Sequence, residues 1–134
     1  MFSRFNPASR RVLRVAEQEC RNHNHYYVGA EHLLFALLEE RDPAILRALD
    51  ADGIDAREVH AEVRRALGTG EERVWEGILV TPRLRKIVAL AEEAAGPDDV
   101  QPAHLFDALR VEGGSLAAEI LRRSAPRNTA PATE

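Results

Sequence analysis

The stretch VGAEHLLFALL, residues 28–38, returns in altered form 72 residues later as VQPAHLFDAL, residues 100–109. Five positions are identical at this spacing: Val28 and Val100, His32 and His104, Leu33 and Leu105, Ala36 and Ala108, Leu37 and Leu109. Identities that recur in order at one constant spacing indicate that a unit of the chain has been duplicated. This duplication decides how the rest of the sequence is interpreted.

A second pair of similar segments precedes the two copies. NPASRRVLRVAE at residues 6–17 matches TPRLRKIVALAE at residues 81–92, at a spacing of 75, and Pro7 is matched by Pro82. Because the spacing falls from 75 to 72, the second copy has a shorter connection between its first two elements. We predict a first repeat over residues 1–67, a polar, glycine-bounded linker over 68–78 and a second repeat over 79–123.

Composition and charge describe one ordinary globular domain. The chain has 134 residues, of which 45% are apolar and 30% charged, enough for a single hydrophobic core. Its net charge of −4 gives no reason to expect nucleic acid or an anionic membrane as a partner. No apolar run approaches a membrane span and no signal peptide is recognised. With Cys20 as the single cysteine, no internal disulfide forms, and we expect a cytoplasmic protein.

Helix signals are frequent along the chain. Asn6 before Pro7, and Thr81 before Pro82, are typical of a helix N-cap followed by the first helical residue. Further helices are predicted to begin after Gly29, Asp42 and Asp55, at Pro102 and after Ser115. Apolar residues follow at helical spacing, and no segment sustains a period of two. The predicted fold is all-α, with two similar halves around one core, and residues 124–134 are predicted to be a disordered tail.

The quoted stretch, read with the start MFSRFNPASRRVL and the repeated TPRLRKIVALAEE, resembles the N-terminal Clp repeat domain. This domain stands at the head of Clp-type AAA+ unfoldases of the ClpC/ClpA kind, which feed Clp proteases. The resemblance covers roughly residues 1–123 and implies two repeats in pseudo-twofold relation. It also implies a docking platform for adaptors and substrates, which in some members binds phosphorylated arginine. There, a glutamate before each repeat's histidine holds the guanidinium, and the starts of the repeats' first helices help to hold the phosphate.

Two departures from the family pattern matter. The second repeat has no counterpart to residues 55–67, so we expect seven helices and not eight. The family's glutamate is present as Glu31, but its counterpart is Ala103, so the resemblance supports at most one guanidinium site. The chain also has no G-x-x-x-x-G-K-[ST] loop and is therefore not the ATP-driven motor. We expect either an excised domain or a free-standing homologue.

Basic residues lie one turn inside two matched helices. Arg10 follows the start at Asn6, and Arg85 follows the start at Thr81. Free N–H groups and the positive end of a helix favour an anion at such a place, and a guanidinium grips phosphate through two hydrogen bonds. The hypothesis is that Asn6, Arg10 and Glu31 belong to one peptide or phosphoarginine site, with Thr81 and Arg85 at the matched position. The alternative is a solvated basic face.

Apolar residues near the same helix starts give a second candidate surface. Phe2, Phe5, Leu13 and Val80 would line a shallow groove between the two repeat-starting helices and hold a partner peptide. Such a partner would be an adaptor, a substrate or a cyclic peptide antibiotic. The alternative is ordinary core packing, which we expect for Phe5, whereas Phe2 is the better surface candidate.

The leading interpretation is a non-catalytic protein-binding module without a cofactor, either a monomer or a weak dimer. A small enzyme or metal protein using Cys20 and the five histidines is the competing class. However, the H-x-H of residues 23–25 is not a recognised zinc pattern, and a cysteine on an apolar helix face is usually inert. A third interpretation is a scaffold that binds a Clp complex without recognising substrates.

Overall fold

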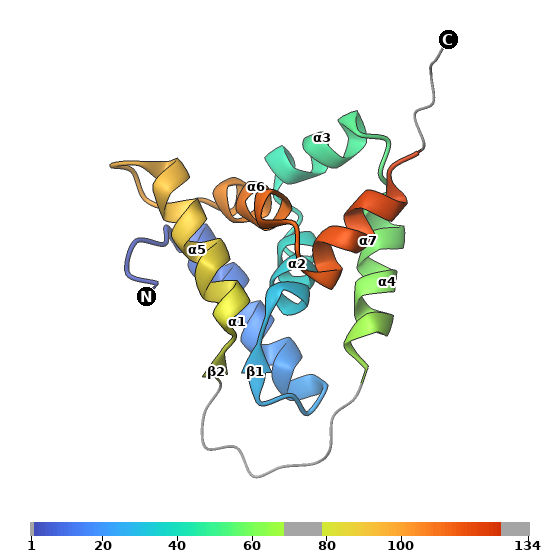
Figure 1. The fold of residues 1–134 in the computed structure, drawn as a ribbon, viewed down its shortest axis with the longest axis horizontal. Helices are drawn as coiled ribbons and strands as arrows, with labels where there is room; N and C mark the ends of the chain where they lie inside the picture. Colours follow the sequence, from blue (N-terminus) through green and yellow to red (C-terminus); the bar gives the residue numbers. More distant parts are fainter. Residues whose placement is uncertain (1, 69–78, 127–134) are drawn as a thin grey trace.

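The computed structural model describes residues 2–68 and 79–126. Within them the helices are α1 (Pro7–Asn22), α2 (Ala30–Glu39), α3 (Pro43–Ala51), α4 (Ala56–Leu67), α5 (Pro82–Ala95), α6 (Pro102–Glu112) and α7 (Leu116–Ser124). Two short strands are also present, β1 (Tyr27–Val28) and β2 (Leu79–Val80). The described part of the chain thus has the seven helices and the all-α character that the sequence predicts, and Figure 1 shows their arrangement.

The matched helix starts form by the same local chemistry. The Asn6 side chain accepts a hydrogen bond from the Ser9 amide at 2.8 Å, and the Thr81 hydroxyl accepts one from the Leu84 amide at 3.1 Å. In each helix a proline follows the cap, at a position where its missing N–H costs nothing. The duplicated sequence therefore specifies duplicated helix starts.

Two backbone pairings relate the repeats by a pseudo-twofold exchange. The segment before α2 pairs with the segment before α5, in the parallel register Tyr27 with Leu79 and Val28 with Val80. The segment before α1 pairs with the segment before α6, through a parallel bridge between Phe5 and Val100. Each repeat therefore supplies one partner to each pairing. The sequence analysis missed these pairings because two-residue strands are too short to show a period.

At each of the matched starts of α2 and α6, a histidine side chain accepts a hydrogen bond from the N-cap amide. The Gly29 amide donates to Nδ1 of His32 at 3.0 Å, and the Gln101 amide donates to Nδ1 of His104 at 2.9 Å. Each histidine is the third residue of its helix, where a glutamine or glutamate often reaches back to the cap. These bonds give both histidines a structural role at the start of a helix.

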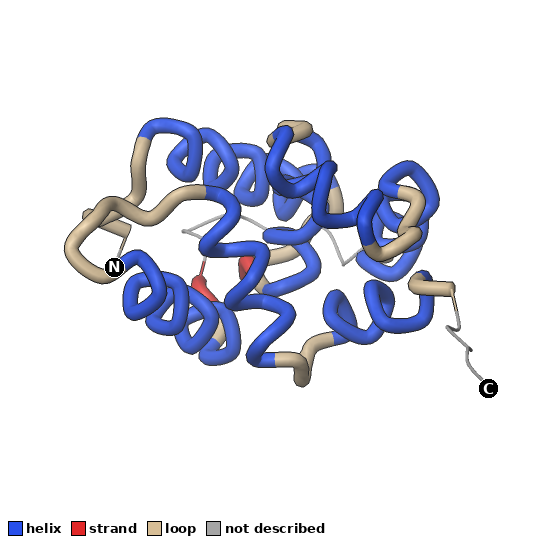
Figure 2. Tube along the Cα trace, turned by 90° about the horizontal axis from the view of Figure 1, so that it is seen from above, coloured by secondary structure: helices blue, strands red, loops and turns tan. Residues whose placement is uncertain are grey.

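The core surrounds α2, which lies at the centre of the bundle in Figure 1, with α1, α4, α6 and α7 about it. Every residue of α2 from His32 to Leu38 is buried, and Leu34 and Leu37 are fully so. Seen from above in Figure 2, the paired strands are a short segment among the helices. The strands therefore fix the helix starts and contribute little to the layers themselves.

Part of the predicted organisation lies outside the described residues. The linker prediction falls almost wholly on residues 69–78, and the tail prediction on residues 127–134. Ser124 is the last residue of α7, and Ala125 packs against the core. The described chain therefore continues three residues past the predicted domain end at residue 123.

Replacing Leu34 by alanine is expected to lower the free energy of unfolding by about 2–5 kcal/mol, because a fully buried leucine leaves a cavity when it is truncated. Urea unfolding followed by circular dichroism measures this change. Val111→Ala is the control: its side chain is 75% exposed, and the expected change is within about 0.5 kcal/mol. Equal effects of the two substitutions would contradict the placement of α2 at the centre of the core.

The fold should also lose stability below pH 6.5 through His32. Burial, followed by the neighbouring His25 and His23 rings, lowers the pKa of His32 from 6.5 to about 4. Between these pH values the unfolded chain binds the extra proton, so stability is full above pH 6.5 and declines as the pH falls toward 4. Through His32, the free energy of unfolding is expected to fall by on the order of 1 kcal/mol per pH unit.

His32→Gln tests this expectation, because glutamine keeps the bond to the cap amide and removes the titrating ring. Urea unfolding between pH 6.5 and 5 should show a flatter decline for the variant than for the wild type. His104→Gln controls for altering a cap of the same kind. A His32→Gln profile parallel to that of the wild type would show that the ring is not a source of the pH dependence.

Candidate functional site

The pairing of β1 with β2 brings three helix starts around one hollow of about 240 Å³. We call it the Glu31 hollow. Its lining comprises Tyr27, Gly29, Ala30, Glu31, Thr81, Arg83, Gly114, Ser115 and Leu116. These residues come from the starts of α2, α5 and α7, so the hollow lies at the junction of the two repeats. Helix starts carry N–H groups without intrahelical partners, and they favour negative charge.

Glu31 is the acidic residue that lines the hollow. Its Oε2 accepts a hydrogen bond from the Ala117 amide at 3.0 Å, in the first turn of α7. Among the described residues, Oε1 of Glu31 has no hydrogen-bond or ion-pair partner. Glu31 therefore ties α2 to α7 with one oxygen and presents negative charge with the other.

Arg83 supplies the positive charge that lines the hollow. Its Nη1 donates to both carboxylate oxygens of Glu112, at 3.1 and 2.9 Å, while 45% of the Arg83 side chain stays exposed. The guanidinium passes so close to Gly114 that any Cβ there would displace it. Glycine at 114 therefore lets Arg83 reach Glu112 at the edge of the hollow.

Tyr27 is held in the wall of the hollow by histidines behind it. Its ring stacks on His25 with a centroid separation of 5.3 Å, and it meets His32 edge-on at 5.5 Å. Nδ1 of His32 accepts the Gly29 amide, so in the neutral ring Nε2 donates to Nδ1 of His25, at 2.8 Å. Burial, followed by the negative charge of Glu31, raises the pKa of Tyr27. The tyrosine is therefore neutral and well anchored.

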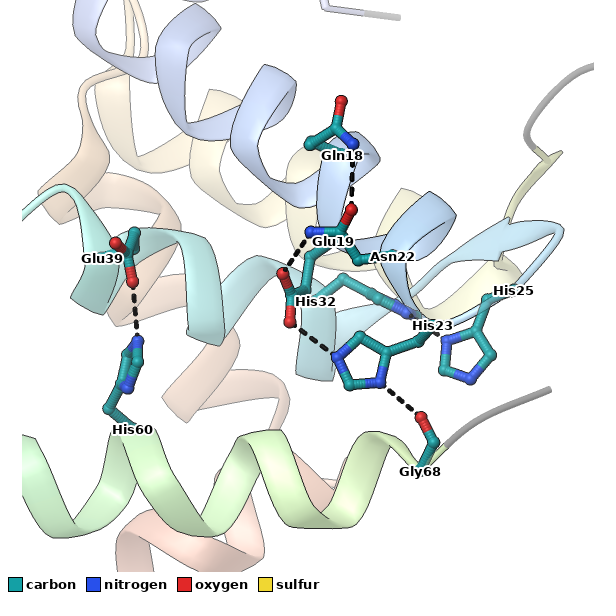
Figure 3. A network of polar contacts seen from close by, with 9 residues as sticks. All are labelled: Gln18, Glu19, Asn22, His23, His25, His32, Glu39, His60 and Gly68. Atoms are coloured by element: carbon teal, nitrogen blue, oxygen red, sulfur yellow. Dashed lines mark hydrogen bonds and ion pairs between the residues drawn. The ribbon is translucent and has the colours of Figure 1, made fainter.

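The same cluster continues to the end of α4, as Figure 3 shows. One nitrogen of His23 contacts Oε2 of Glu19 at 2.7 Å, and the other contacts the carbonyl oxygen of Gly68. His23 also stacks on His25, at a centroid separation of 5.7 Å. The histidines of residues 23–32 thus connect the ends of α1 and α4 to the wall of the hollow.

The structure separates the predicted site residues into two places. Thr81 caps α5 beside Glu31, and both line the hollow. Asn6 caps α1 beside Val100. The backbone amide of Asn6 donates to the Val100 carbonyl oxygen at 3.0 Å. Each of these two helix starts pairs with a segment of the opposite repeat. Asn6 and Arg10 do not line the Glu31 hollow.

Arg85 is not among the residues that line the hollow. It follows Arg83 by two positions on α5, which is about 200° around a helix of 3.6 residues per turn. It precedes Val88 by three residues, and Arg10 precedes Leu13 by three, so each arginine shares a helix face with that apolar residue. Arg83 is the residue that sequence reasoning missed, since no local pattern distinguishes it from Arg85.

Where the apolar groove was predicted, the structure has a small gap lined mostly by buried core residues. Phe2, Phe5 and Leu13 line it together with Leu84 and Val88 of α5, but its volume is only about 10 Å³. Phe2, one of the lining residues, packs on Phe5 with ring centroids 5.1 Å apart. Val80, which was predicted to line the groove, packs against the core but not in the gap. Phe5 is buried, as expected.

Cys20 and the histidines show no catalytic or metal-binding arrangement within the described residues. The Cys20 thiol is buried and donates to the carbonyl oxygen of Tyr27 at 2.9 Å. Burial, followed by the charge of Glu17, raises the pKa of Cys20 to about 12, so the reactive thiolate is disfavoured. No group of three or more His, Cys, Asp or Glu side chains is placed to hold a metal ion in residues 2–68 and 79–126. In the same residues, no helix is long and apolar enough to cross a membrane.

Curated relatives match nearly the whole chain. It is 32% identical over 124 residues to the negative regulator of genetic competence ClpC/MecB of Bacillus subtilis, and 31% identical over 124 residues to the chaperone protein ClpB of Oceanobacillus iheyensis. Each match covers 90% of this chain but only 15% of the relative. The chain thus spans a small part of the length of the curated relatives it matches.

Solved structures share the fold. The N-terminal domain of the chaperone ClpD from Arabidopsis thaliana superposes with a TM-score of 0.68 at 18% identity, covering 92% of this chain and 86% of that one. A structure titled as a preliminary investigation of a malarial protein secretion system superposes with a TM-score of 0.73 at 19% identity, covering 91% and 85%. Residues 4–123 match the family model of the Clp repeat (R) N-terminal domain. The chain belongs to the Clp repeat (R) N-terminal domain family.

Proposed function

We propose that this domain is a non-catalytic, cytoplasmic protein-binding module that recognises adaptors or substrates of a Clp chaperone–protease system. We further propose that the Glu31 hollow binds a phosphorylated arginine of such a partner. The observation that carries the proposal is the meeting of one available carboxylate oxygen with helix starts and a guanidinium in a single hollow. The carboxylate complements the guanidinium of phosphoarginine, and the helix starts with Arg83 complement its phosphoryl group.

The chemistry of each half can be assigned to residues of the hollow. A guanidinium donates to carboxylates through charge-assisted hydrogen bonds, and Glu31 has one oxygen available for such a bond. A phosphoryl group suits the start of α5, which Thr81 caps, and the exposed part of Arg83. The matched position in the second repeat is Ala103, which has no carboxylate. We therefore propose one phosphoarginine site per domain.

The gap that Phe2 lines between α1 and α5 is the second contact surface in this proposal. Arg10 and Arg85 share helix faces with Leu13 and Val88 beside the gap. A bulky apolar ligand, such as a cyclic peptide antibiotic, would have to displace Phe2 to enter it. Asn6, the cap of α1, and Val80, just before α5, are proposed as further contacts of the same partner.

The competing enzyme and scaffold interpretations predict different behaviour. An enzyme using Cys20 needs a thiolate, which the burial of this cysteine opposes. A scaffold that does not recognise substrates should bind its complex equally well without the charge of Glu31. The proposal therefore depends on what the Glu31 carboxylate contributes to binding.

Glu31→Gln is the sharpest test, because glutamine still offers an oxygen to the Ala117 amide and removes only the charge. Titration of free phosphoarginine by calorimetry should show binding to the wild type and at least about tenfold weaker binding to the variant, since a hydrogen bond between charged groups contributes about 1.5–3 kcal/mol. Glu93→Ala, an exposed carboxylate on α5, is the matched control and should bind like the wild type. No heat with the wild type, or equal affinity for Glu31→Gln, would refute the phosphoarginine site.

A pull-down from a bacterial lysate separates substrate recognition from scaffolding. The wild-type domain should retain phosphoarginine-containing proteins that Glu31→Gln releases, detected by mass spectrometry of the bound fraction. Glu93→Ala should retain the same set as the wild type. Identical sets for wild type and Glu31→Gln would favour the scaffold interpretation.

A further inference from the structure

Large apolar side chains are exposed at five positions in the described chain. They are Tyr26 at 43% exposed, Tyr27 at 36%, Leu79 at 63%, Val111 at 75% and Leu116 at 46%. Single exposed apolar residues are normal, but a contiguous group usually marks a binding surface. The positions of these five residues relative to the Glu31 hollow are therefore informative.

Two of the five line the Glu31 hollow, and two more lie next to Tyr27 in its wall. Tyr27 and Leu116 line it directly. Leu79 is the partner of Tyr27 in the β1–β2 register, and the Tyr26 ring meets the Tyr27 ring edge-on at 5.6 Å. We call these four residues the apolar rim. Val111, near the end of α6, is not among the lining residues.

The rim is held in place before any ligand arrives. Tyr27 stacks on His25 and its carbonyl oxygen accepts the Cys20 thiol. The Leu79 amide donates to the Tyr26 carbonyl oxygen at 3.0 Å, and Leu116 is the first residue of α7, whose start Ser115 caps. A surface ordered in advance loses little conformational entropy on binding, so its apolar area contributes to affinity.

We propose that the apolar rim binds bulky apolar side chains on either side of the phosphoarginine, so that the ligand is an extended peptide and not the modified residue alone. This inference rests on the proposed function of the Glu31 hollow and names its substrate class. In an extended peptide, side chains two positions from the phosphoarginine point to the same side as it does. These are the side chains that reach the rim when the phosphoarginine occupies the hollow.

The charge of the hollow and the character of its rim together select one kind of partner. Glu31 and Arg83 complement a phosphorylated guanidinium, whereas the rim offers apolar surface and no charge. Bulky apolar residues near a modified arginine are mostly buried in a folded protein and become accessible when it unfolds. The domain would therefore prefer phosphoarginine in unfolded segments over phosphoarginine on a folded surface.

Two synthetic pentapeptides with blocked ends test this inference. Both carry phosphoarginine at the centre and serine beside it; one has leucine at both outer positions and the other has serine there. Calorimetry with the wild-type domain should give about fivefold to tenfold tighter binding of the leucine peptide, because two leucines become partly buried. Free phosphoarginine is titrated in parallel.

Leu79→Ser assigns the preference to the rim. Leu79 does not line the hollow, so the variant should bind free phosphoarginine within about twofold of the wild type, yet lose about threefold or more in affinity for the leucine peptide. Val111→Ser removes an equally exposed apolar side chain away from the rim and should behave as the wild type with every ligand. Thermal unfolding confirms that both variants are folded.

The outcomes separate the two proposals. If free phosphoarginine and both peptides bind with equal affinity, the rim has no role and the inference is overturned, while the phosphoarginine site stands. If the leucine preference survives Leu79→Ser unchanged, or falls equally in Val111→Ser, the rim as defined here is also overturned. If neither peptide nor free phosphoarginine binds the wild type, both proposals are refuted.

Discussion

The structure depends on two short backbone pairings in which the repeats exchange partners. Val28 pairs with Val80, and Phe5 pairs with Val100. Each pairing is only one or two residues long, yet each fixes the start of one helix against the start of a helix from the other repeat. The repeats are therefore interlocked and do not simply lie side by side. Sites at the helix starts are consequently shared between repeats.

This exchange explains where the charged residues meet. Glu31 in the first repeat lies beside Thr81 and Arg83 in the second, because β1 and β2 hold α2 and α5 together. Asn6 belongs to the other pairing, next to Val100 before α6, and Arg10 lies one turn further along α1. A site built from matching residues of both repeats would need the like starts to be adjacent, and the exchange prevents that.

Much of the fold follows from local sequence chemistry. The caps at Asn6 and Thr81, the prolines after them and the duplicated histidines act within one turn of helix, so each helix start is predictable from its own residues. The absence of a second-repeat counterpart to α4 is equally visible as a missing segment. These features set the number of helices and their order.

The site was harder to predict because it depends on contacts between distant segments. Nothing near Glu31 in the sequence indicates that the start of α7 supplies its hydrogen-bond donor, 86 positions away. The choice between Arg83 and Arg85 depends on which face of α5 turns toward α2, and sequence periodicity alone does not decide it. The apolar rim escaped notice for the same reason, since Tyr27, Leu79 and Leu116 become neighbours only through the pairing.

Only the first repeat has a carboxylate before its histidine: Glu31 there is matched by Ala103. This difference has a local cause. In the second repeat's last helix, the Ala117 amide is satisfied by Glu31 from across the junction, at 3.0 Å. In the matching helix of the first repeat, the Ala44 amide is satisfied at 3.1 Å by Asp42, its own cap residue.

With that amide already satisfied locally, no carboxylate is needed at position 103, and the alanine found there leaves no unpaired donor behind. Ser115 caps α7 through the Ala118 amide instead, at 3.0 Å. The carboxylate that completes the start of α7 is thus the same group that gives the hollow its negative charge. On the proposed function, Glu31 therefore serves both the fold and the ligand, and the proposed single site per domain follows from how the two matched helices are capped.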